Sequence, residues 1–201
     1  MKELLIATAN KGKFREIELL LQGTVACLYA VTDFPELPEV LEDGKTFEEN
    51  AIKKAQGATK ITGKPVIADD SGLMVDVLNG DPGVRSARYA GDGSNDDANN
   101  SKLLRNLAGV PLPHRTAAFH AVIALCFPDG YCRTFTGELR GMILDAPLGD
   151  GGFGYDPLFL VPELGQTLAE IPIDIKNSLS HRGKALSLLK EFLQSLGSTP
   201  C

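Results

Sequence analysis

The chain has no tryptophan, few histidines and few cysteines, and its basic residues are outnumbered by acidic ones. The four cysteines are Cys27, Cys126, Cys132 and Cys201. None of them forms a Cys-x-x-Cys pair, so the sequence has neither metal-ligand spacing nor a dense disulfide framework. We therefore expect all four to be reduced thiols of a cytoplasmic protein.

The excess of acidic residues excludes one class of partner. The 20 Lys and Arg against 26 Asp and Glu give a formal net charge of −6. A protein that binds polymeric nucleic acid needs a basic surface, which this composition does not favour. A nucleotide ligand stays compatible with the composition, because a few lysines converging on one site would suffice.

Long apolar runs are also absent. No stretch approaches the ~20 apolar residues of a membrane span, and the run from Met1 to Ile6 is too short for a signal peptide. The sequence shows no internal repeat, low-complexity segment or flexible linker. A chain of 201 residues can bury a substantial core without disulfides or a structural metal. We expect one domain over residues 1–201, with no membrane association.

The hydrophobic pattern alternates between short apolar runs and helical periodicity. Expected strands are 4–8, 24–32, 65–68, 73–78, 116–127, 131–136 with its extension 137–144 past a glycine, and 158–161. Expected helices are 14–22, 46–59, 98–107 and 181–196, the second with the capping-box pattern Thr46…Glu49 and the last with Ser180 as its cap. The order predicts an α/β fold, a mixed sheet flanked by helices, with two lobes and a cleft between them.

The polar segment Thr8–Lys13 joins the first expected strand to the first expected helix. Free backbone N–H groups and lysines at such a junction suit a phosphate. The segment is not a Walker A loop, because the Gly-x-x-x-x-Gly-Lys-Ser/Thr spacing is absent. An ordinary turn with solvated lysines also fits the pattern.

Asp69 and Asp70 are adjacent carboxylates at the end of the apolar run 65–68. Holding them together requires a compensating cation or proton. Magnesium prefers one or two carboxylates with phosphate and water. Adjacent strand residues point to opposite sides, so one aspartate would face a given site while the other braces the turn. A solvated strand end is the alternative.

Other candidate groups are ambiguous when taken alone. Lys53 or Lys54 could reach the site, although Lys53 is also placed for a surface pair with Glu49. Arg85 and Arg88 fit a solvated loop.

The glycine-rich segment 149–157 would let the backbone approach a flat ligand closely. Phe153 and Tyr155 could stack on that ligand, although simple packing also explains these aromatics. His181 and Arg182 begin the last helix, whose dipole would assist anion binding, or are exposed polar residues of a first turn.

Together, these pieces resemble one family. The motifs in order are Thr8-x-Asn10-x-x-Lys13, Thr46-Phe47-x-Glu49-Asn50-Ala51, Ala68-Asp69-Asp70-Ser71-Gly72-Leu73, Pro82-Gly83-x-x-Ser86-Ala87-Arg88, Gly152-Phe153-Gly154-Tyr155-Asp156-Pro157 and Ser180-His181-Arg182. They are similar to those of the inosine/xanthosine triphosphate pyrophosphatases of the bacterial dITP/XTP type. The resemblance runs from Leu5 to about Leu193.

The resemblance implies hydrolysis of ITP, dITP and XTP to the monophosphate and pyrophosphate, with Mg²⁺, in a homodimer with an elongated mixed sheet. It implies that Asp70 accepts a proton from the attacking water and binds Mg²⁺. The residues implied to bind the substrate are Thr8, Ala9, Asn10, Lys11, Gly12, Lys13, Ser71, Phe153, Gly154, Tyr155, Asp156, Lys176, His181 and Arg182. Those from Phe153 onward would bind chiefly the base, with donors near His181 and Arg182 suited to its 6-oxo group.

Two positions depart from the family pattern. Ala9 replaces a usual glycine, a small change that should leave the turn intact. A second magnesium carboxylate is usual three residues before the glycine matching Gly44, where this chain has Leu41. Glu42, Glu39 or water would then complete the metal shell.

Two other functions stay open. One is a pyrophosphatase for other modified nucleotides, such as pyrimidines, and the other is a non-catalytic nucleotide sensor. A kinase or ATPase is disfavoured because the Walker A spacing is absent.

Overall fold

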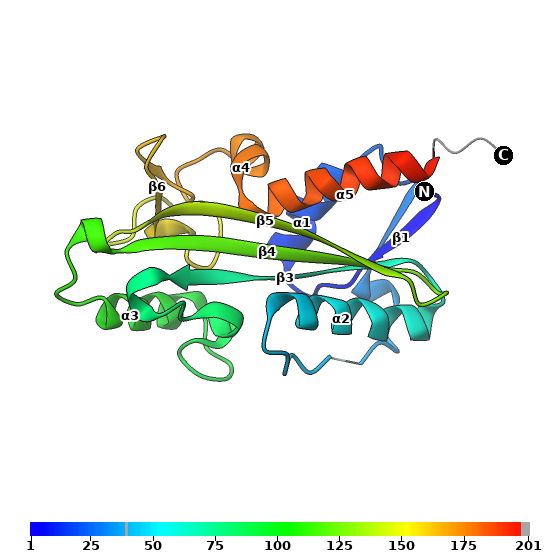
Figure 1. The fold of residues 1–201 in the computed structure, drawn as a ribbon, viewed down its shortest axis with the longest axis horizontal. Coiled ribbons are helices and arrows are strands. Elements are labelled where there is room, and N and C mark those ends of the chain that lie inside the picture. Colours follow the sequence, from blue (N-terminus) through cyan, green and yellow to red (C-terminus); the bar gives the residue numbers. More distant parts are fainter. Residues whose placement is uncertain (39, 198–201) are drawn as a thin grey trace. The chain divides into compact units, whose positions relative to one another are not determined.

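The computed structural model describes residues 1–38 and 40–197 (Figure 1). The chain divides into two compact units, each described here by itself. The first unit comprises Met1–Asp70, Ala121–Gly137 and Arg182–Cys201. The second unit comprises Ser71–His120 and Glu138–His181.

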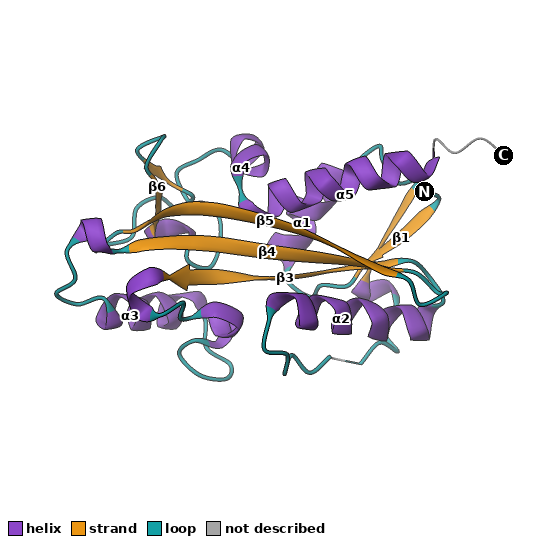
Figure 2. Cartoon of the chain, viewed as in Figure 1, coloured by secondary structure: helices purple, strands orange, loops and turns teal. Residues whose placement is uncertain are grey.

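The elements alternate as the hydrophobic pattern predicts (Figure 2). The strands are β1 (Glu3–Ile6), β2 (Cys27–Ala30), β3 (Val66–Val75), β4 (Thr116–Cys126), β5 (Cys132–Ile143), β6 (Phe159–Val161) and β7 (Gln166–Thr167). The α-helices are α1 (Lys11–Leu21), α2 (Phe47–Thr62), α3 (Asp96–Asn106), α4 (Ile173–Leu179) and α5 (His181–Gly197).

The strands form a mixed sheet in the order β2-β1-β3-β4-β5-β6-β7. β1 pairs in parallel with both β2 and β3, whereas β5–β6 and β6–β7 are antiparallel. The mixed α/β class predicted from the sequence is therefore confirmed. The expected cleft between two lobes stays a prediction.

Strand alternation sorts the core of the first unit into two layers. Leu4, Ile6 and Ile67 pack in one cluster with side chains of α1 and α5. Leu5, Val66 and Ala68 point the other way and pack against the small residues of α2, Ala51, Ala55 and Ala58. Figure 1 shows α2 on one side of these strands and α5 on the other. This alternation decides what the two aspartates after Ala68 contact.

A single cluster forms the core of the second unit. Its members come from β3, α3, β4, β5 and the segment after residue 150, and include Leu73, Leu103, Phe119, Tyr155 and Phe159. Gly141 on β5 is required there, because a Cβ would overlap the carbonyl oxygen of Leu160 and the ring of Phe159.

Several element boundaries differ from the sequence expectations. β3 is one continuous strand, because the Asp-Asp-Ser-Gly segment keeps extended backbone. β5 continues past Gly137, as expected. α1 begins at Lys11, since the Asn10 side chain accepts a hydrogen bond from the backbone N–H of Lys13 and caps the helix earlier. β2 is shorter than predicted, and α4 and β7 were not predicted from the sequence.

The cysteine prediction is wrong for two of the four residues. Cys126 and Cys132 face each other across the β4–β5 hairpin, with Cα atoms 4.2 Å apart, and form a disulfide. Cys27 is an exposed free cysteine, and Cys201 lies outside the described residues. Over residues 1–38 and 40–197, no helix combines the length and apolar character that crossing a membrane requires.

Candidate functional site

The polar segment after β1 is partly turn and partly the first turn of α1. Thr8 Oγ1 accepts from the N–H of Asn10 at 3.2 Å, and Asn10 Oδ1 accepts from that of Lys13 at 3.0 Å. These side-chain caps fix the junction, while the N–H groups of Lys11 and Gly12 belong to the helix end, which lacks intrahelical acceptors. The predicted phosphate segment therefore has donors, lysines and a defined backbone.

Asp69 is buried on the α1 and α5 side of β3. Its Oδ2 lies 2.6 Å from Lys13 Nζ, and its Oδ1 accepts from Arg182 Nε at 3.1 Å. Burial alone would raise the pKa of Asp69, but the charges of Arg182 and Lys13 outweigh it and hold that pKa far below its ordinary value. Asp69 is thus a permanently ionised carboxylate that positions two cations.

Asp70 is buried on the opposite side of β3, toward α2. Its Oδ1 accepts from Lys54 Nζ at 2.8 Å, and its Oδ2 accepts from Asn50 Nδ2 at 3.2 Å. Burial raises the pKa of Asp70 above its ordinary value, even though Lys54 opposes the shift. A carboxyl group with a raised pKa is a stronger base than an ordinary one, as proton abstraction requires.

Lys54 lies between two carboxylates. Its ammonium is 2.8 Å from Asp70 Oδ1 and 3.1 Å from Glu42 Oε1, and it also donates to the carbonyl of Asp69. Burial would lower the pKa of Lys54, but Asp70 and Glu42 reverse that effect and raise it. Lys54 therefore remains charged at the site, whereas Lys53 pairs with Asp43 at the surface.

The position that departs from the family pattern lies beside this cluster. The Leu41 side chain is 71% exposed, and the next residue, Glu42, reaches Lys54. The backbone N–H of Gly44 donates to Asn50 Oδ1 at 2.8 Å, which ties the segment to α2. The structure thus brings Glu42 to the Lys54 cluster, and Glu39 lies outside the described residues.

Sequence reasoning missed the buried pair formed by Glu16 and Arg182. Arg182 Nη1 donates to Glu16 Oε2 at 2.5 Å while Arg182 Nε donates to Asp69. The two carboxylates together raise the pKa of the guanidinium despite its burial. One signal was available: Glu16 follows Lys13 by three residues, on the same face of α1. The one-turn spacing of Asn50 and Lys54 on α2 was a similar signal that both side chains lie on one face of that helix.

The glycine-rich segment of the second unit is folded around Asp156. Asp156 Oδ2 accepts from the N–H of Phe153 at 2.9 Å and from Lys176 Nζ at 2.6 Å. Gly152 has φ +72°, and a Cβ there would collide with the Asp156 carboxylate. The Lys176 ammonium also lies 4.9 Å from the centre of the Phe153 ring. This local fold brings Phe153, Asp156 and Lys176 together, and their role in nucleotide binding stays a prediction.

Tyr155 packs inside the second unit. The side chain is buried in the core of the second unit, and its hydroxyl donates to the carbonyl of Ser86 at 2.9 Å. The assignment of Tyr155 to base binding stays a prediction. Phe153, which is half-buried, is the remaining aromatic of the pair.

The other predicted residues fall in both units. Ser71 is half-buried on β3, directly after Asp70. His181 is buried, and its ring stacks on Phe119 at 4.8 Å with an angle of 10°. Within the first unit the structure brings together Lys13, Asp69 and Arg182 on one side of β3, and it places Asp70 on the other side. Ala9 and Lys11 are exposed.

Fold and site define an α/β protein in which buried carboxylates, lysines and a capped helix start are gathered at strand ends, an arrangement suited to phosphate anhydrides. The chain belongs to the Ham1 family, whose model matches residues 4–192.

Similar proteins support this membership. The chain is 60% identical over 193 residues to the dITP/XTP pyrophosphatase of Geobacter sulfurreducens, covering 96% of this chain and 97% of that protein. Among solved structures, the Ham1 protein of Staphylococcus aureus matches with a TM-score of 0.87 and 42% identity, over 97% of this chain and 100% of that one. The dITP/XTP pyrophosphatase of Mycobacterium abscessus matches with a TM-score of 0.76 and 43% identity, over 93% and 98% of the two chains.

Proposed function

We propose that this protein hydrolyses the non-standard purine nucleoside triphosphates ITP, dITP and XTP to the monophosphate and pyrophosphate, and so removes them from the nucleotide pool. Near-full-length identity of 60% to a dITP/XTP pyrophosphatase supports the reaction. One observation carries the chemistry: the buried carboxyl of Asp70, with its raised pKa, lies against Lys54 and Asn50.

Binding of the triphosphate is assigned to the start of α1. The N–H groups of this helix end and the Lys13 ammonium would face phosphate oxygens, as at other anion-binding helix starts. Lys13 is fixed by Asp69 at 2.6 Å, so its charge is positioned before the ligand arrives. Lys54 adds a second ammonium to the cluster and favours the pyrophosphate leaving group.

The donor set fits magnesium. In the described part of the chain, no group of three or more His, Cys, Asp or Glu side chains is suited to a metal ion. Asp70 and Glu42 instead form a carboxylate pair around one cation, the Lys54 ammonium. Two carboxylates with phosphate oxygens and water are what Mg²⁺ prefers. We assign Asp70 and Glu42 as its ligands, with Glu42 in place of the missing carboxylate at Leu41.

Proton transfer is assigned to Asp70. Magnesium, when bound, supplies positive charge that offsets the charge of the triphosphate. The ionised Asp70 carboxylate orients a water and accepts its proton as the water attacks. Asn50 and Lys54 fix the orientation of both Asp70 oxygens, so the base does not have to reorganise during the reaction.

Base recognition is assigned to the second unit and to the start of α5. Phe153 offers an aromatic surface, and Lys176, held by Asp156, offers N–H donors for a 6-oxo group. Adenine has an amino group at that position and would leave a buried donor unsatisfied, at about 1–3 kcal/mol per group. Arg182 holds Asp69 and Glu16, and its assignment to the nucleotide rests on the resemblance alone.

The experiment is pyrophosphate release from ITP, XTP, GTP, ATP and a modified pyrimidine triphosphate, with and without Mg²⁺. We expect turnover of ITP and XTP only with the metal. Turnover confined to the pyrimidine would favour the first alternative, and binding without turnover would favour a nucleotide sensor. Release of orthophosphate would contradict the reaction itself.

The variant Asp70→Asn tests the catalytic assignment. The amide keeps the shape of the side chain but cannot accept the proton, so we expect turnover to fall by at least about a thousandfold. Binding of ITP, measured by calorimetry without metal, should change by less than about tenfold, since Lys13 and the start of α1 are intact. An Asp70→Asn protein with full activity would refute the role of Asp70.

Magnesium binding by Glu42 has a test that does not depend on activity. Mn²⁺ is titrated by calorimetry into the Asp70→Asn protein and into the Glu42→Gln protein, each in the presence of ITP. Both variants should bind the metal more weakly than wild type does. Asp43→Asn, whose carboxylate pairs with Lys53 at the surface, is the matched control and should bind Mn²⁺ as wild type does. We further propose a cytoplasmic homodimer, which size-exclusion chromatography with light scattering would test.

A further inference from the structure

Three side chains hold the backbone on either side of the Phe153 ring. The N–H of Phe153 donates to Asp156 Oδ2 at 2.9 Å, and the next N–H, that of Gly154, donates to Asp96 Oδ2 at 2.7 Å. The carbonyl of Gly154 accepts from Asn100 Nδ2 at 3.0 Å. Asp156 has a place in the proposed function, whereas Asp96 and Asn100 have none so far.

Both of these residues come from α3 and lie one turn apart. Positions i and i+4 of a helix share a face, so Asp96 and Asn100 reach the N–H and the carbonyl of Gly154 from one helix. A hydrogen bond to an ionised carboxylate is shorter and stronger than a neutral one. Together, the two bonds fix the two peptide planes that follow Phe153.

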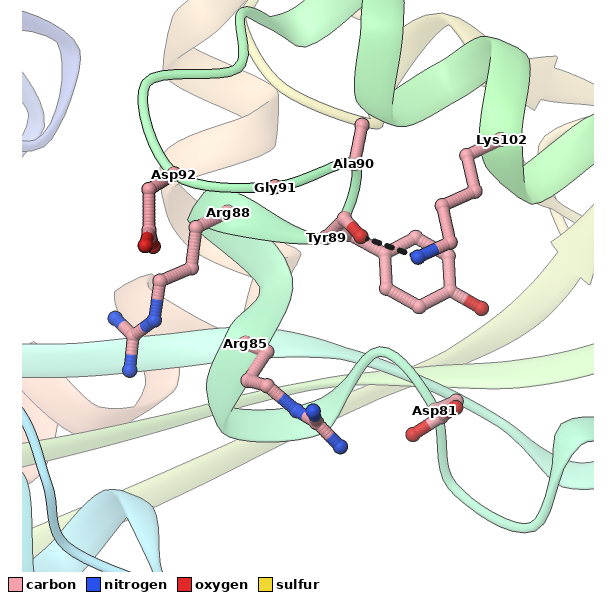
Figure 3. Close-up of a pocket in the computed structure, with 8 residues that line it drawn as sticks. All are labelled: Asp81, Arg85, Arg88, Tyr89, Ala90, Gly91, Asp92 and Lys102. Carbon is pink, nitrogen blue, oxygen red and sulfur yellow. Dashed lines mark hydrogen bonds between the residues drawn. The ribbon is translucent and has the colours of Figure 1, made fainter.

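α3 is anchored, so these contacts start from a fixed base. Leu103 of this helix is fully buried in the core of the second unit. Asn99 donates to the carbonyl of Ala87 at 3.1 Å, and Lys102 donates to that of Tyr89 at 2.6 Å. Figure 3 shows the bond from Lys102 to Tyr89. A binding segment that is held in advance loses less conformational entropy when its ligand arrives.

Asn100 carries a cost that stability does not explain. Its amide nitrogen binds Gly154, but within residues 1–38 and 40–197 its buried Oδ1 has no hydrogen-bond partner. A buried acceptor without a partner destabilises the folded state. An apolar side chain would avoid this cost but would lose the contact with the Gly154 carbonyl. This favours a role for Asn100 in holding the glycine-rich segment.

We propose that Asp96 and Asn100 are positioning residues for nucleotide binding, which set the direction of the Phe153 ring by fixing the backbone that follows it. The inference rests on the proposed function, in which this ring offers the aromatic surface for the base. The ring centre also lies 4.9 Å from the Lys176 ammonium, so a ring that turns away leaves the cation that offers donors to the base. Both residues act through Phe153.

The kinetic test compares Asp96→Ala with its matched control, Asp97→Ala. Both aspartates are exposed in the first turn of α3, so both variants lose the same favourable charge at the helix start. Asp96 differs in accepting the hydrogen bond from Gly154. We expect Asp96→Ala to raise KM for ITP by about tenfold with kcat within about twofold, because base contacts bind the ground state and the transition state alike.

The remaining single variants sharpen this comparison. Asp97→Ala should stay within about twofold of wild type in both constants. Asp96→Asn keeps an acceptor for the N–H of Gly154 and should restore most of the lost KM. Asn100→Ala should raise KM by about fivefold, since a neutral bond is lost. Equal KM values for Asp96→Ala and Asp97→Ala would overturn the proposal.

A double-mutant cycle separates positioning from a general structural role. In a Phe153→Ala background there is no ring to position, so adding Asp96→Ala should change KM by less than about twofold, whereas independent effects would multiply. Thermal unfolding would show that each variant is folded. Multiplied effects on KM would contradict an action through Phe153.

The absence of tryptophan from the chain gives a readout that needs no turnover. Phe153→Trp introduces a single indole at the position that Asp96 and Asn100 are proposed to fix. Adding Asp96→Ala should lower the fluorescence anisotropy of this indole, and adding Asp97→Ala should not. Unchanged anisotropy with Asp96→Ala would refute the positioning role whatever the activity. Absence of pyrophosphate release from ITP in wild type would instead refute the proposed reaction, so the two failures are distinguishable.

Discussion

At the scale of single residues, the two adjacent aspartates have opposite electrostatic environments. On β3, the Asp69 side chain contacts Lys13 and Arg182, whereas the Asp70 side chain points to the opposite face and contacts Lys54 and Asn50. Burial raises the pKa of both carboxyl groups. The charges of Arg182, Lys13 and Lys54 overcome that effect at Asp69 and lower its pKa, whereas those of Lys54 and Lys13 do not overcome it at Asp70, where Glu42 adds to the effect of burial. Asp69 is therefore an ionised anchor for its cations, and we propose the neighbouring Asp70, with its raised pKa, as the base.

The anchoring role predicts a large stability loss in Asp69→Asn. The change leaves Lys13 and Arg182 without their shared counter-charge, and breaking a buried pair in this way costs about 3–5 kcal/mol. Urea denaturation would measure it. Asp150→Asn is the control, because Asp150 is exposed, and it should unfold as wild type does. Equal stability of the two variants would contradict the role of Asp69 as an anchor.

The same substitution predicts a pH dependence. The folded pKa of Asp69 is lowered from its ordinary value of 3.8, so its stabilisation is fully present above that pH. It is lost as the pH falls toward the folded value, where the carboxylate becomes protonated in both states. The stability gap between wild type and Asp69→Asn should therefore be constant near neutral pH and narrow in acid. A gap that widened in acid would contradict this assignment.

Neighbouring lysines on α2 give a matched pair of variants. Lys54 contacts Asp70 and Glu42, whereas Lys53 pairs with Asp43 at the surface. We expect Lys54→Gln to lower kcat/KM for ITP by about a hundredfold, the loss typical of a charged group that contacts the reacting phosphates. Lys53→Gln should stay within about twofold of wild type. Equal effects in steady-state kinetics would remove Lys54 from the site.

At the scale of elements, the glycine-rich segment shows which glycines are required. Gly152 and Gly154 both have positive φ, +72° and +64°, but only a Cβ at Gly152 would meet the Asp156 carboxylate. Gly152→Ala should displace Asp156 and, with it, Lys176. Both alanine variants strain the backbone, but only Gly152→Ala also displaces a charged contact. We therefore expect KM for ITP to rise at least about tenfold more in Gly152→Ala than in Gly154→Ala. Similar KM values would mean that Asp156 does not organise this segment.

The sequence predicted those elements whose ends carry side-chain signals. Thr46 caps α2 as expected, accepting from the N–H of Glu49, although the Glu49 carboxylate returns to Lys45 instead of completing a capping box. α4 has seven residues, too few for a helical period to be recognised. β3 was divided at its polar centre because an interior strand position rarely holds two carboxylates, and only their partners on α1, α2 and α5 make this possible.

The site was predictable in its motifs and less so in its contacts. The resemblance pointed to Lys13, Asp70, Asp156 and Lys176, and the structure pairs the last two. Glu16 was not predicted, because its partner Arg182 is 166 residues away in sequence. Long-range pairs of this kind depend on the register of packed helices, which local patterns do not encode. The roles of these residues in catalysis stay predictions.

At the scale of the whole molecule, charge is distributed in two opposing ways. The chain has a net charge of −6, yet several cations are buried or half-buried beside the two aspartates. Such an arrangement repels long polyanions through the overall field and attracts a short one through local contacts. The sequence alone predicted the repulsion of long polyanions, and the structure shows the cations that would attract a short one.

This balance predicts that inhibition depends on polyanion length. Tripolyphosphate should compete with ITP, because it can reach Lys13 and the start of α1 without a long repelling chain. Single-stranded RNA at the same phosphate concentration should leave pyrophosphate release unchanged, since the negative overall field opposes its approach. Added salt screens both the local attraction and the overall repulsion, with a Debye length of about 8 Å at 0.15 M. Raising the salt concentration should therefore weaken inhibition by tripolyphosphate, and RNA should still not inhibit. Equal inhibition by RNA would show a basic surface that the composition excludes.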